Sequence, residues 1–248
     1  GTRRTSGVIS VNEGLRRWAI DDLHHPPDRV WYVANFVMDP RPCPTPPPSL
    51  PGAPGRRIVC VARVAPQKDL INLVQAMARV VTVVPDAHAL VLGVESDAEY
   101  GRHVRAEIAR LGLTERVWLL GGRTDATDVV QASDIGVLSS AGEGLPLALV
   151  EYGLCRRPSV ATGVGQCADV LDQGRAGILV PPHDAEALAE GLLRLLRSPE
   201  ERERLAERAW RYAMDHHSVA AVVRQVTDIY DVLLGAEGAA PGRCQPTP

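Results

Sequence analysis

Two cations, Arg63 and Lys68, follow the first apolar run after a proline-rich stretch and precede an amphipathic segment. Lys68 is the one lysine in a chain whose combined Lys and Arg total is 27. Lysine offers a compact, rotatable charge for a phosphate oxygen, whereas the arginine fork matches planar partners. Two cations at a strand end therefore predict a site for an anion such as a diphosphate. The alternative is a surface lysine at a helix start, where the helix dipole disfavours a cation.

The stretch "SSAGEGLPLALVEYGLC", residues 139–155, has the pattern of a tight turn that leads into a helix. Gly142 and Gly144 allow the backbone to turn sharply, and Pro146 suits the first position of a helix. The main-chain N–H groups near Leu145 are then expected at a helix N-terminus, where they can face an anion.

Two carboxylates belong to the same stretch. Glu143 lies on the turn, and Glu151 lies farther along in an otherwise apolar helix. Burying a carboxylate is costly unless it accepts hydrogen bonds. Sugar hydroxyls would donate such bonds, so Glu151 is a candidate sugar ligand; the alternative is an exposed helix face.

The elements that must position these residues are short apolar runs alternating with amphipathic segments, beginning with "RIVCVARV", "LINLVQAMARVVTVV" and "HALVLGV". This alternation predicts an α/β fold with a doubly wound parallel sheet, because buried parallel strands need helical crossovers. Ligands of such sheets bind beyond the carboxyl ends of the strands. Any one polar residue there could be a solvated turn, but five successive strand ends carry binding-type residues: Arg63 and Lys68; Gly93 and Glu95; Gly121, Gly122 and Arg123; Ser139, Ser140, Gly142, Glu143 and Gly144; Thr162, Gly163, Gly165 and Gln166.

Composition excludes several classes of protein. A hydrophobic content of 45% is enough for a core, and a formal charge of −3 argues against binding nucleic acid through bulk electrostatics. The five cysteines are odd in number and lack the spacing of a zinc site or redox pair, so free thiols in a reducing compartment are expected. No apolar run reaches the roughly 18 residues of a membrane span. These features predict a soluble intracellular domain.

The ordered set "VARVAPQKDL", "HALVLGV", "RVWLLGGRTDATDVVQASDIGVLSS", "EGLPLALVE", "VATGVGQCADVL" and "GILVPPHDAEALAEGLLRLL" resembles the donor-binding half of a large glycosyltransferase family. The family is the retaining GT-B type, family 4 or group 1, with two facing Rossmann-like domains. The resemblance covers roughly residues 56–234. It implies that the arginine and lysine hold a nucleotide diphosphate, the second glutamate binds the ribose, and the first lies by the transferred sugar.

Residue by residue, the resemblance implies catalytic roles and donor contacts at positions that match the family pattern. The catalytic residues would be Arg63, Lys68 and Glu143, and the donor-binding residues Gly93, Gly122, Arg123, Gly144, Leu145, Pro146 and Glu151, with no metal. Three residues depart from the family pattern: Asp69 stands where a glycine often follows the lysine, Gln166 replaces a glycine, and Asp169 replaces a glutamate. These departures bear on the identity of the transferred sugar more than on the diphosphate site.

Four segments are expected. Residues 1–39 would be a strand-helix-strand remnant of the N-terminal acceptor domain, with Asn12 capping the helix. Residues 40–55, rich in proline, would be a hinge or linker. Residues 56–235 would form the nucleotide-sugar-binding domain as the C-terminal half of the GT-B fold, and residues 236–248 a disordered tail.

The implied activity is transfer of a sugar from a nucleoside-diphosphate-sugar to an unknown acceptor (glycan, lipid or small molecule), with retention of configuration and no cofactor. The chain alone would be incomplete for catalysis. A nucleotide-sugar epimerase and a non-catalytic nucleotide-sugar-binding module remain alternatives. A dinucleotide dehydrogenase is disfavoured because no G-x-G-x-x-G follows the first strand. We expect a cytoplasmic protein, at the inner face of a membrane if the acceptor is a lipid, and self-association through apolar surface that the N-terminal domain would cover.

Overall fold

The computed structural model describes residues 5–42, 44 and 47–235. Its contacts divide the chain into two compact units, a larger one of residues 40–213 and a smaller one that joins residues 1–39 to residues 214–248. The segment 236–248, expected to be a disordered tail, lies outside the described residues.

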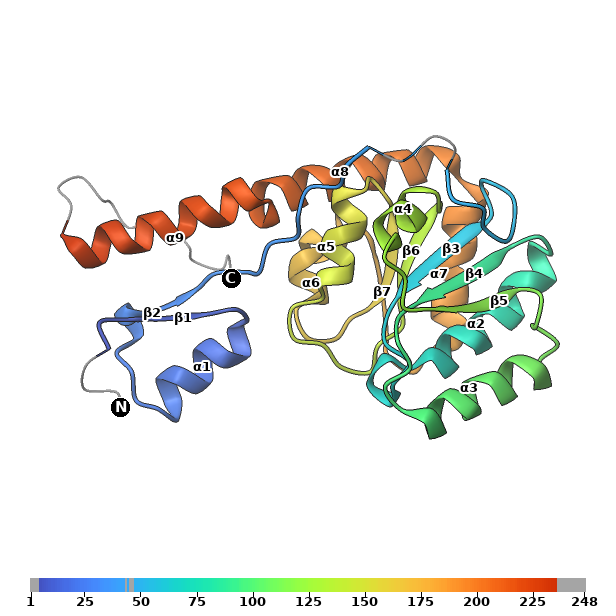
Figure 1. Ribbon diagram of the computed structural model, residues 1–248, viewed down its shortest axis with the longest axis horizontal. Coiled ribbons are helices and arrows are strands. Elements are labelled where there is room, and N and C mark those ends of the chain that lie inside the picture. Colours follow the sequence, from blue (N-terminus) through green and yellow to red (C-terminus); the bar gives the residue numbers. More distant parts are fainter. Residues whose placement is uncertain (1–4, 43, 45–46, 236–248) are drawn as a thin grey trace. The chain divides into compact units, whose positions relative to one another are not determined.

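The larger unit is built on a six-stranded parallel sheet in the order β5-β4-β3-β6-β7-β8 (Figure 1). Its strands are short runs of mostly β-branched and aliphatic residues, which suits strands covered on both faces. Their bounds are β3 (Arg57–Val61), β4 (His88–Leu92), β5 (Val117–Gly121), β6 (Ile135–Leu138), β7 (Ser159–Thr162) and β8 (Ile178–Val180).

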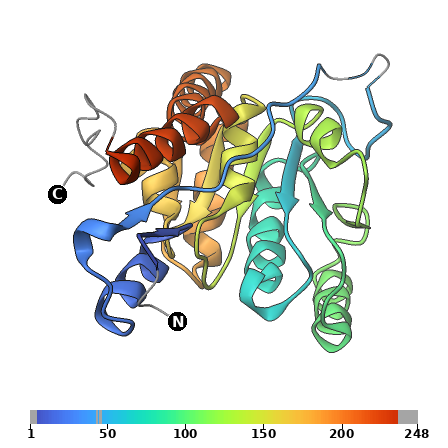
Figure 2. The same cartoon turned by 60° about the vertical axis from the view of Figure 1, so that its left-hand side comes forward.

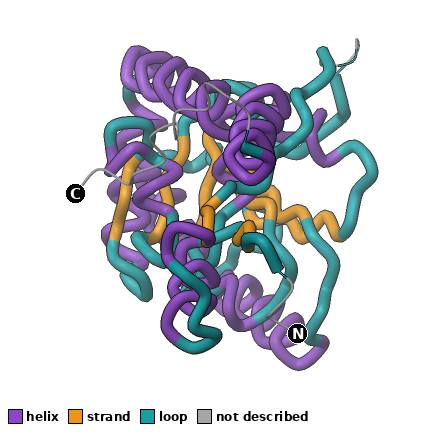
Figure 3. Tube along the Cα trace, turned by 90° about the vertical axis from the view of Figure 1, so that its left-hand side faces the viewer, coloured by secondary structure: helices purple, strands orange, loops and turns teal. Residues whose placement is uncertain are grey.

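Helices cover both faces of this sheet, so the predicted doubly wound α/β class is confirmed (Figures 1 and 3). On one face α2 (Leu70–Val83) packs against α3 (Ala98–Arg110) and α7 (Ala185–Arg197), and Figure 2 shows α2 and α3 side by side in teal and green. The other face carries α4 (Ala126–Gln131), α5 (Leu147–Leu154) and α6 (Cys167–Val170). Aspartates at 69, 97 and 184 cap α2, α3 and α7, each accepting from a main-chain N–H in the first turn. The 3₁₀ turn η4 (Asp172–Gly174) precedes β8, and α8 (Pro199–His217) follows α7.

The strand order creates a topological switch point between β3 and β6, because the chain leaves β3 toward β4 and β5 and then returns to β6 on the other side. The two strands pair only at Ile58 with Ile135 and Val59 with Gly136. Beyond these pairs they separate, and the Tyr152 hydroxyl from α5 fills the gap. It accepts from the Val61 N–H at 2.7 Å and donates to the Val137 carbonyl at 3.3 Å.

We expect Tyr152→Phe to destabilise the larger unit by about 1–3 kcal/mol, because the buried Val61 N–H would lose its partner. Tyr152 is 0% exposed, so water cannot replace the hydroxyl without repacking. Urea denaturation measures the effect, with Tyr230→Phe, an exposed position on another helix, as the matched control. Equal stabilities of Tyr152→Phe and the parent chain would show that the bridge contributes nothing.

The smaller unit contains a two-stranded parallel sheet of β1 (Val8–Ser10) and β2 (Val30–Tyr32), the helix α1 (Glu13–Asp21), the turn η2 (Pro27–Arg29) and α9 (Val219–Leu234). The predicted Asn12 cap is confirmed: its side chain accepts from the Leu15 N–H at 2.8 Å. Val222 and Ile229 of α9 pack against Val33 in a small core. By their contacts, residues 214–235 therefore group with residues 5–39. The boundary after residue 235 and the assignment of residues 1–39 to an acceptor domain stay predictions.

Within the larger unit, Arg57 of β3 holds the end of the proline-rich segment by hydrogen bonds. Its guanidinium donates to the carbonyls of Leu50, Pro51 and Gly52. A hinge role for residues 40–55 stays a prediction. Within the described part of the chain, no helix combines the length and apolar character needed to cross a membrane.

Candidate functional site

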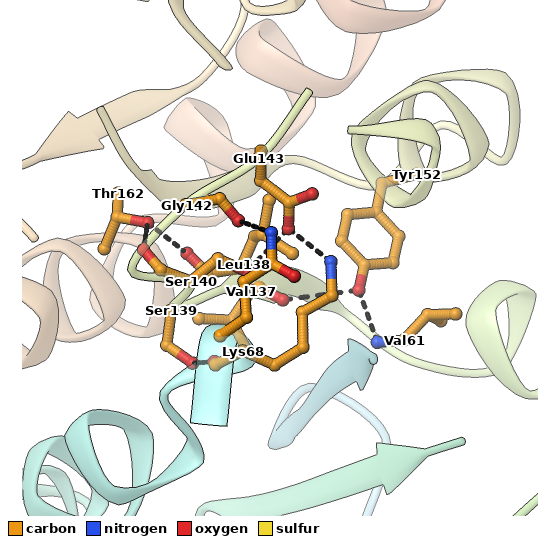
Figure 4. A network of polar contacts seen from close by, with 11 residues as sticks. Val61, Lys68, Val137, Leu138, Ser139, Ser140, Gly142, Glu143, Tyr152 and Thr162 are labelled. Atoms are coloured by element: carbon orange, nitrogen blue, oxygen red, sulfur yellow. Dashed lines mark hydrogen bonds and ion pairs between the residues drawn. The ribbon is translucent and has the colours of Figure 1, made fainter. Parts of the chain in front are cut away.

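Lys68 and Glu143 meet at the switch point (Figure 4). Lys68 ends the 3₁₀ turn η3 (Pro66–Lys68) after β3, and Glu143 lies on the loop between β6 and α5. Lys68 Nζ lies 2.5 Å from Glu143 Oε1, and the Ser140 hydroxyl donates to the same oxygen at 2.6 Å. The side chains of Lys68 and Glu143 are 18% and 8% exposed, so the pair is largely removed from water.

Further hydrogen bonds join the two loops that carry this pair. The Ala141 N–H donates to the Gln67 carbonyl at 2.9 Å, and the Gln67 amide donates to the Gly142 carbonyl at 2.9 Å. The Ser139 hydroxyl donates to the Lys68 carbonyl at 3.0 Å. Both backbone and side chain of the Lys68 turn are therefore fixed against the β6 loop.

The loop after β7 supports the Glu143 turn from a second side. The Thr162 hydroxyl donates to the Ser140 carbonyl at 2.6 Å. Gly165, with φ of +54°, lies so close that a Cβ there would stand 2.1 Å from the Glu143 carbonyl oxygen and 3.0 Å from that of Gly144. A glycine is required at 165 on both counts, because side chains disfavour this φ and have no room.

Arg63 occupies the same loop as Lys68 but stands apart from the ion pair. It is exposed, directly after the buried Ala62. Among the described residues, its side chain has neither a hydrogen bond nor an ion pair. The structure thus brings Lys68 to Glu143 and leaves the guanidinium of Arg63 at the surface of the strand end.

Glu151 lies on α5 in a separate environment. Its Oε1 accepts from the Thr127 hydroxyl of α4 at 3.1 Å. Burial raises the pKa of the Glu151 carboxyl, and the Thr127 hydrogen bond opposes part of that rise. The predicted exposed-face alternative does not apply, since this carboxylate is half-buried and hydrogen-bonded.

The candidates from the loops after β4 and β5 have structural contacts of their own. A Cβ at Gly93 would stand 2.1 Å from the Ala62 carbonyl oxygen, so glycine lets the loops after β3 and β4 approach each other. Gly122 is exposed. Arg123 donates two hydrogen bonds to Asp125, at 2.7 and 2.6 Å, which hold the guanidinium within its own loop.

The turn before α5 differs from its prediction by one residue. Pro146 is the cap, with φ of −80° and ψ of 86°, and the helix begins at Leu147. The proline ring fixes φ but leaves ψ free, so it does not force Pro146 itself into the helix. The Gly144 carbonyl accepts from the Gln166 N–H at 3.0 Å. Leu145, which lies between Gly144 and Pro146 in the sequence, is half-buried.

Sequence reasoning assigned no site role to Thr127 or Tyr152, although each contacts a candidate residue or its strand. Ser140 was counted among the binding-type residues after its strand, but its bond to Glu143 was not predicted. Thr127 and Tyr152 act on residues 24 and 91 positions away, which no local spacing reveals.

The buried cysteines near the site are not suited to act as thiolate nucleophiles. Burial raises the pKa values of Cys60 and Cys167 to about 12, so both thiols stay protonated at neutral pH. Within the described ranges, no group of three or more His, Cys, Asp or Glu side chains is arranged to hold a metal ion.

The fold is a Rossmann-like α/β domain whose candidate site lies where such sheets bind ligands. Residues 55–198 match the family model described as glycosyl transferases group 1. The chain therefore belongs to the glycosyl transferases of group 1, as the motif resemblance implied.

Two similar curated proteins show how much of a relative the chain represents. It is 29% identical over 238 residues to a phosphatidyl-myo-inositol mannosyltransferase of Mycobacterium leprae, covering 92% of this chain and 59% of that protein. It is 30% identical over 167 residues to the N-acetyl-alpha-D-glucosaminyl L-malate synthase of Bacillus anthracis, covering 67% of this chain and 43% of that protein. The chain thus spans about half the length of these curated relatives.

The crystal structure of Anabaena Alr3699/HepE in complex with UDP-glucose superimposes with a TM-score of 0.78 at 21% identity. The superposition covers 94% of this chain and 65% of that one. It confirms the expected fold, the C-terminal half of a GT-B architecture.

Proposed function

We propose that the chain is the donor-binding part of a retaining glycosyltransferase that moves a sugar from a nucleoside-diphosphate-sugar to an acceptor. The observation that carries the proposal is the Lys68–Glu143 pair at the switch point, on loops joined by hydrogen bonds. A lysine ammonium has three N–H donors, and Glu143 takes one. Two donors remain for phosphate oxygens, beside the exposed guanidinium of Arg63.

In this proposal the two cations act on the leaving group. Negative charge grows on the diphosphate as the glycosidic bond loosens, and Arg63 and Lys68 stabilise that charge more in the transition state than in the ground state. Main-chain N–H groups at the start of α5 add to this stabilisation. No metal or other cofactor is invoked.

Glu143 and Glu151 receive different roles. Glu143 accepts from Lys68 and Ser140 through one oxygen, which fits a carboxylate that orients groups near the transferred sugar rather than a nucleophile. Glu151 binds the ribose hydroxyls, for which its remaining acceptor sites are suited, since Thr127 uses one of them. The proposed base contacts are main-chain groups and side chains of the loops after β4 and β5 at Gly93, Gly122 and Arg123; those to the phosphates are near Gly144, Leu145 and Pro146.

The remaining proposals concern partners and place. The acceptor is a glycan, lipid or small molecule, and we place the protein in the cytoplasm, at the inner face of a membrane if the acceptor is a lipid. The smaller unit exposes large apolar side chains, among them Trp18 at 50% and Tyr230 at 57%. Self-association through this apolar surface is proposed for the chain by itself.

Two assays test the proposal. Calorimetric titration of the 248-residue chain with UDP, GDP and ADP, each in the presence of a chelator, should give selective binding of one nucleotide. A longer polypeptide that restores the full length of the curated relatives should then transfer sugar from the matching donor, and NMR of the product should show the donor's anomeric configuration.

Each assay has an opposing result. A product of inverted configuration would overturn retention, and a change of the sugar itself without an acceptor would indicate an epimerase. Donor binding without transfer by the longer polypeptide, across lipid, glycan and small-molecule acceptors, would favour a non-catalytic binding module. No binding of any nucleotide by either polypeptide would overturn the proposal.

The Glu151 role makes a pH-dependent prediction. Because burial raises the pKa of Glu151, its carboxylate becomes protonated at a higher pH than an ordinary glutamate as the pH falls. Nucleotide affinity should fall over that range, as a protonated carboxyl accepts ribose hydroxyls less well. Thr127→Val, which removes the opposing hydrogen bond, should move this fall to higher pH, and Thr127→Ser should leave it in place.

Calorimetry at several pH values measures the affinities. The nucleotide's own phosphate also titrates near pH 6, so each variant is compared with Glu151→Gln, which lacks the titrating carboxyl. Identical pH profiles for the parent chain and Glu151→Gln would contradict the assigned role.

A further inference from the structure

Two non-glycine residues with left-handed backbone face each other beside the site. Asp69, which directly follows Lys68, has φ of +42°, and His183, in the loop after β8, has φ of +57°. His183 Nδ1 lies 2.7 Å from Asp69 Oδ2, across 114 positions of sequence.

Left-handed backbone crowds the Cβ of residues other than glycine, and Asp and His adopt it more often than most, with help from local contacts. Asp69 is held by both carboxylate oxygens. Oδ1 caps α2 by accepting from the Asn72 N–H at 3.3 Å, and Oδ2 contacts His183. The packing of α2 against α7, the helix that follows His183, brings the two loops together.

The contact completes the support of the Lys68 turn. On the β6 side, Ser139 holds the Lys68 carbonyl and Glu143 holds its ammonium. Asp69 is the next residue along the chain, so His183 fixes the same turn from the side of the β8 loop. Without that contact, the Asp69 side chain would keep only its capping bond, beside the bond that its main-chain N–H donates to the Pro66 carbonyl at 3.0 Å.

We propose that Asp69 and His183 form a latch that positions the Lys68 turn for the nucleotide diphosphate. Both are positioning residues, acting through Lys68. The claim that the pair fixes the Lys68 turn stands on the geometry alone. The claim that this turn is positioned for the diphosphate rests on the proposed function. A contact of this kind offsets the strain of a left-handed aspartate, which glycine at the same position would not have.

The test uses substitutions that spare the backbone conformation. His183→Gly removes the imidazole yet tolerates the positive φ, and Asp69→Gly makes the latch unnecessary. The two single variants and the double variant form a double-mutant cycle, measured in the full 248-residue chain. His183→Asn, whose side-chain nitrogen is as many bonds from Cα as Nδ1, serves as rescue, and His103→Ala, at an exposed position of α3, as control.

Two readouts are measured: hydrogen exchange of the Lys68 and Leu70 amides by NMR, and calorimetric affinity for the nucleoside diphosphate that the parent chain binds best. For His183→Gly we expect exchange faster by about tenfold and affinity weaker by about fivefold, as for loss of one exposed charge-assisted contact. His183→Asn should restore much of both. In the Asp69→Gly background, His183→Gly should change neither.

The outcomes separate the latch from the proposed function. Unchanged exchange in His183→Gly, or an equal effect in the Asp69→Gly background, would overturn the latch. Faster exchange with unchanged affinity would keep the latch but overturn its role toward the diphosphate. If the parent chain binds no nucleotide, the proposed function fails and with it the role toward the diphosphate, while exchange alone decides whether the pair fixes the turn.

Discussion

Lys68→Ala is expected to weaken nucleoside diphosphate binding by about 100-fold or more. The substitution removes the cation proposed to contact the diphosphate, and it also leaves Glu143, whose side chain is 8% exposed, without its ionic partner. An unpaired carboxylate at that place repels an incoming anion and is costly in itself. The loss should therefore exceed that of a simple surface charge.

Calorimetry measures this loss, and two comparisons separate its parts. The double variant Lys68→Ala with Glu143→Gln should recover part of the affinity, since the repelling charge is gone. Arg197→Ala, which removes an exposed cation of α7, should bind as the parent chain does. An affinity of Lys68→Ala within about twofold of the parent chain would rule out contact between Lys68 and the diphosphate.

Gly165→Ala is expected to abolish nucleotide binding and to destabilise the larger unit by about 1–3 kcal/mol. A Cβ at 165 would stand 2.1 Å from the carbonyl oxygen and 2.7 Å from the carbonyl carbon of Glu143. These are main-chain atoms, so no side-chain rotation can relieve the clash. The Glu143 turn must move, and with it the group that pairs with Lys68.

The matched control lies two residues earlier. At Gly163 an added Cβ would meet nothing nearer than the Val180 carbonyl oxygen, at 3.7 Å, which is ordinary contact. Gly163→Ala should therefore keep both stability and binding. Urea denaturation and calorimetry on the two variants measure the difference, and equal behaviour of Gly163→Ala and Gly165→Ala would refute the steric argument.

The sequence was sufficient to predict the fold and the edge of the sheet where the candidates gather. Short apolar runs between amphipathic segments specify buried parallel strands, and the carboxyl ends of parallel strands share one edge. Arg63, Lys68 and Glu143 were therefore found as strand-end residues without any coordinates. Their roles stay predictions, because neither fold nor similarity tests what a residue binds.

Local reasoning failed at one helix boundary and at a contact between residues far apart in the chain. The turn before α5 was expected to start its helix at Pro146, and the structure starts it at Leu147 because proline leaves its own ψ free. Glu151 was recognised as a carboxylate in need of a donor, but Thr127 could not be named as that donor.

By itself the sequence determined the doubly wound α/β fold class and the membership of the group 1 glycosyl transferases. Hydrophobic periodicity and the order of motifs can both be read along the chain without coordinates. Only the tertiary structure decided that Lys68 pairs with Glu143, that the Tyr152 hydroxyl joins the separating strands β3 and β6, and that Asp69 is held by His183. These contacts join residues 75, 91 and 114 positions apart. Such distances are closed by the packing of helices on the sheet, which no spacing along the chain encodes.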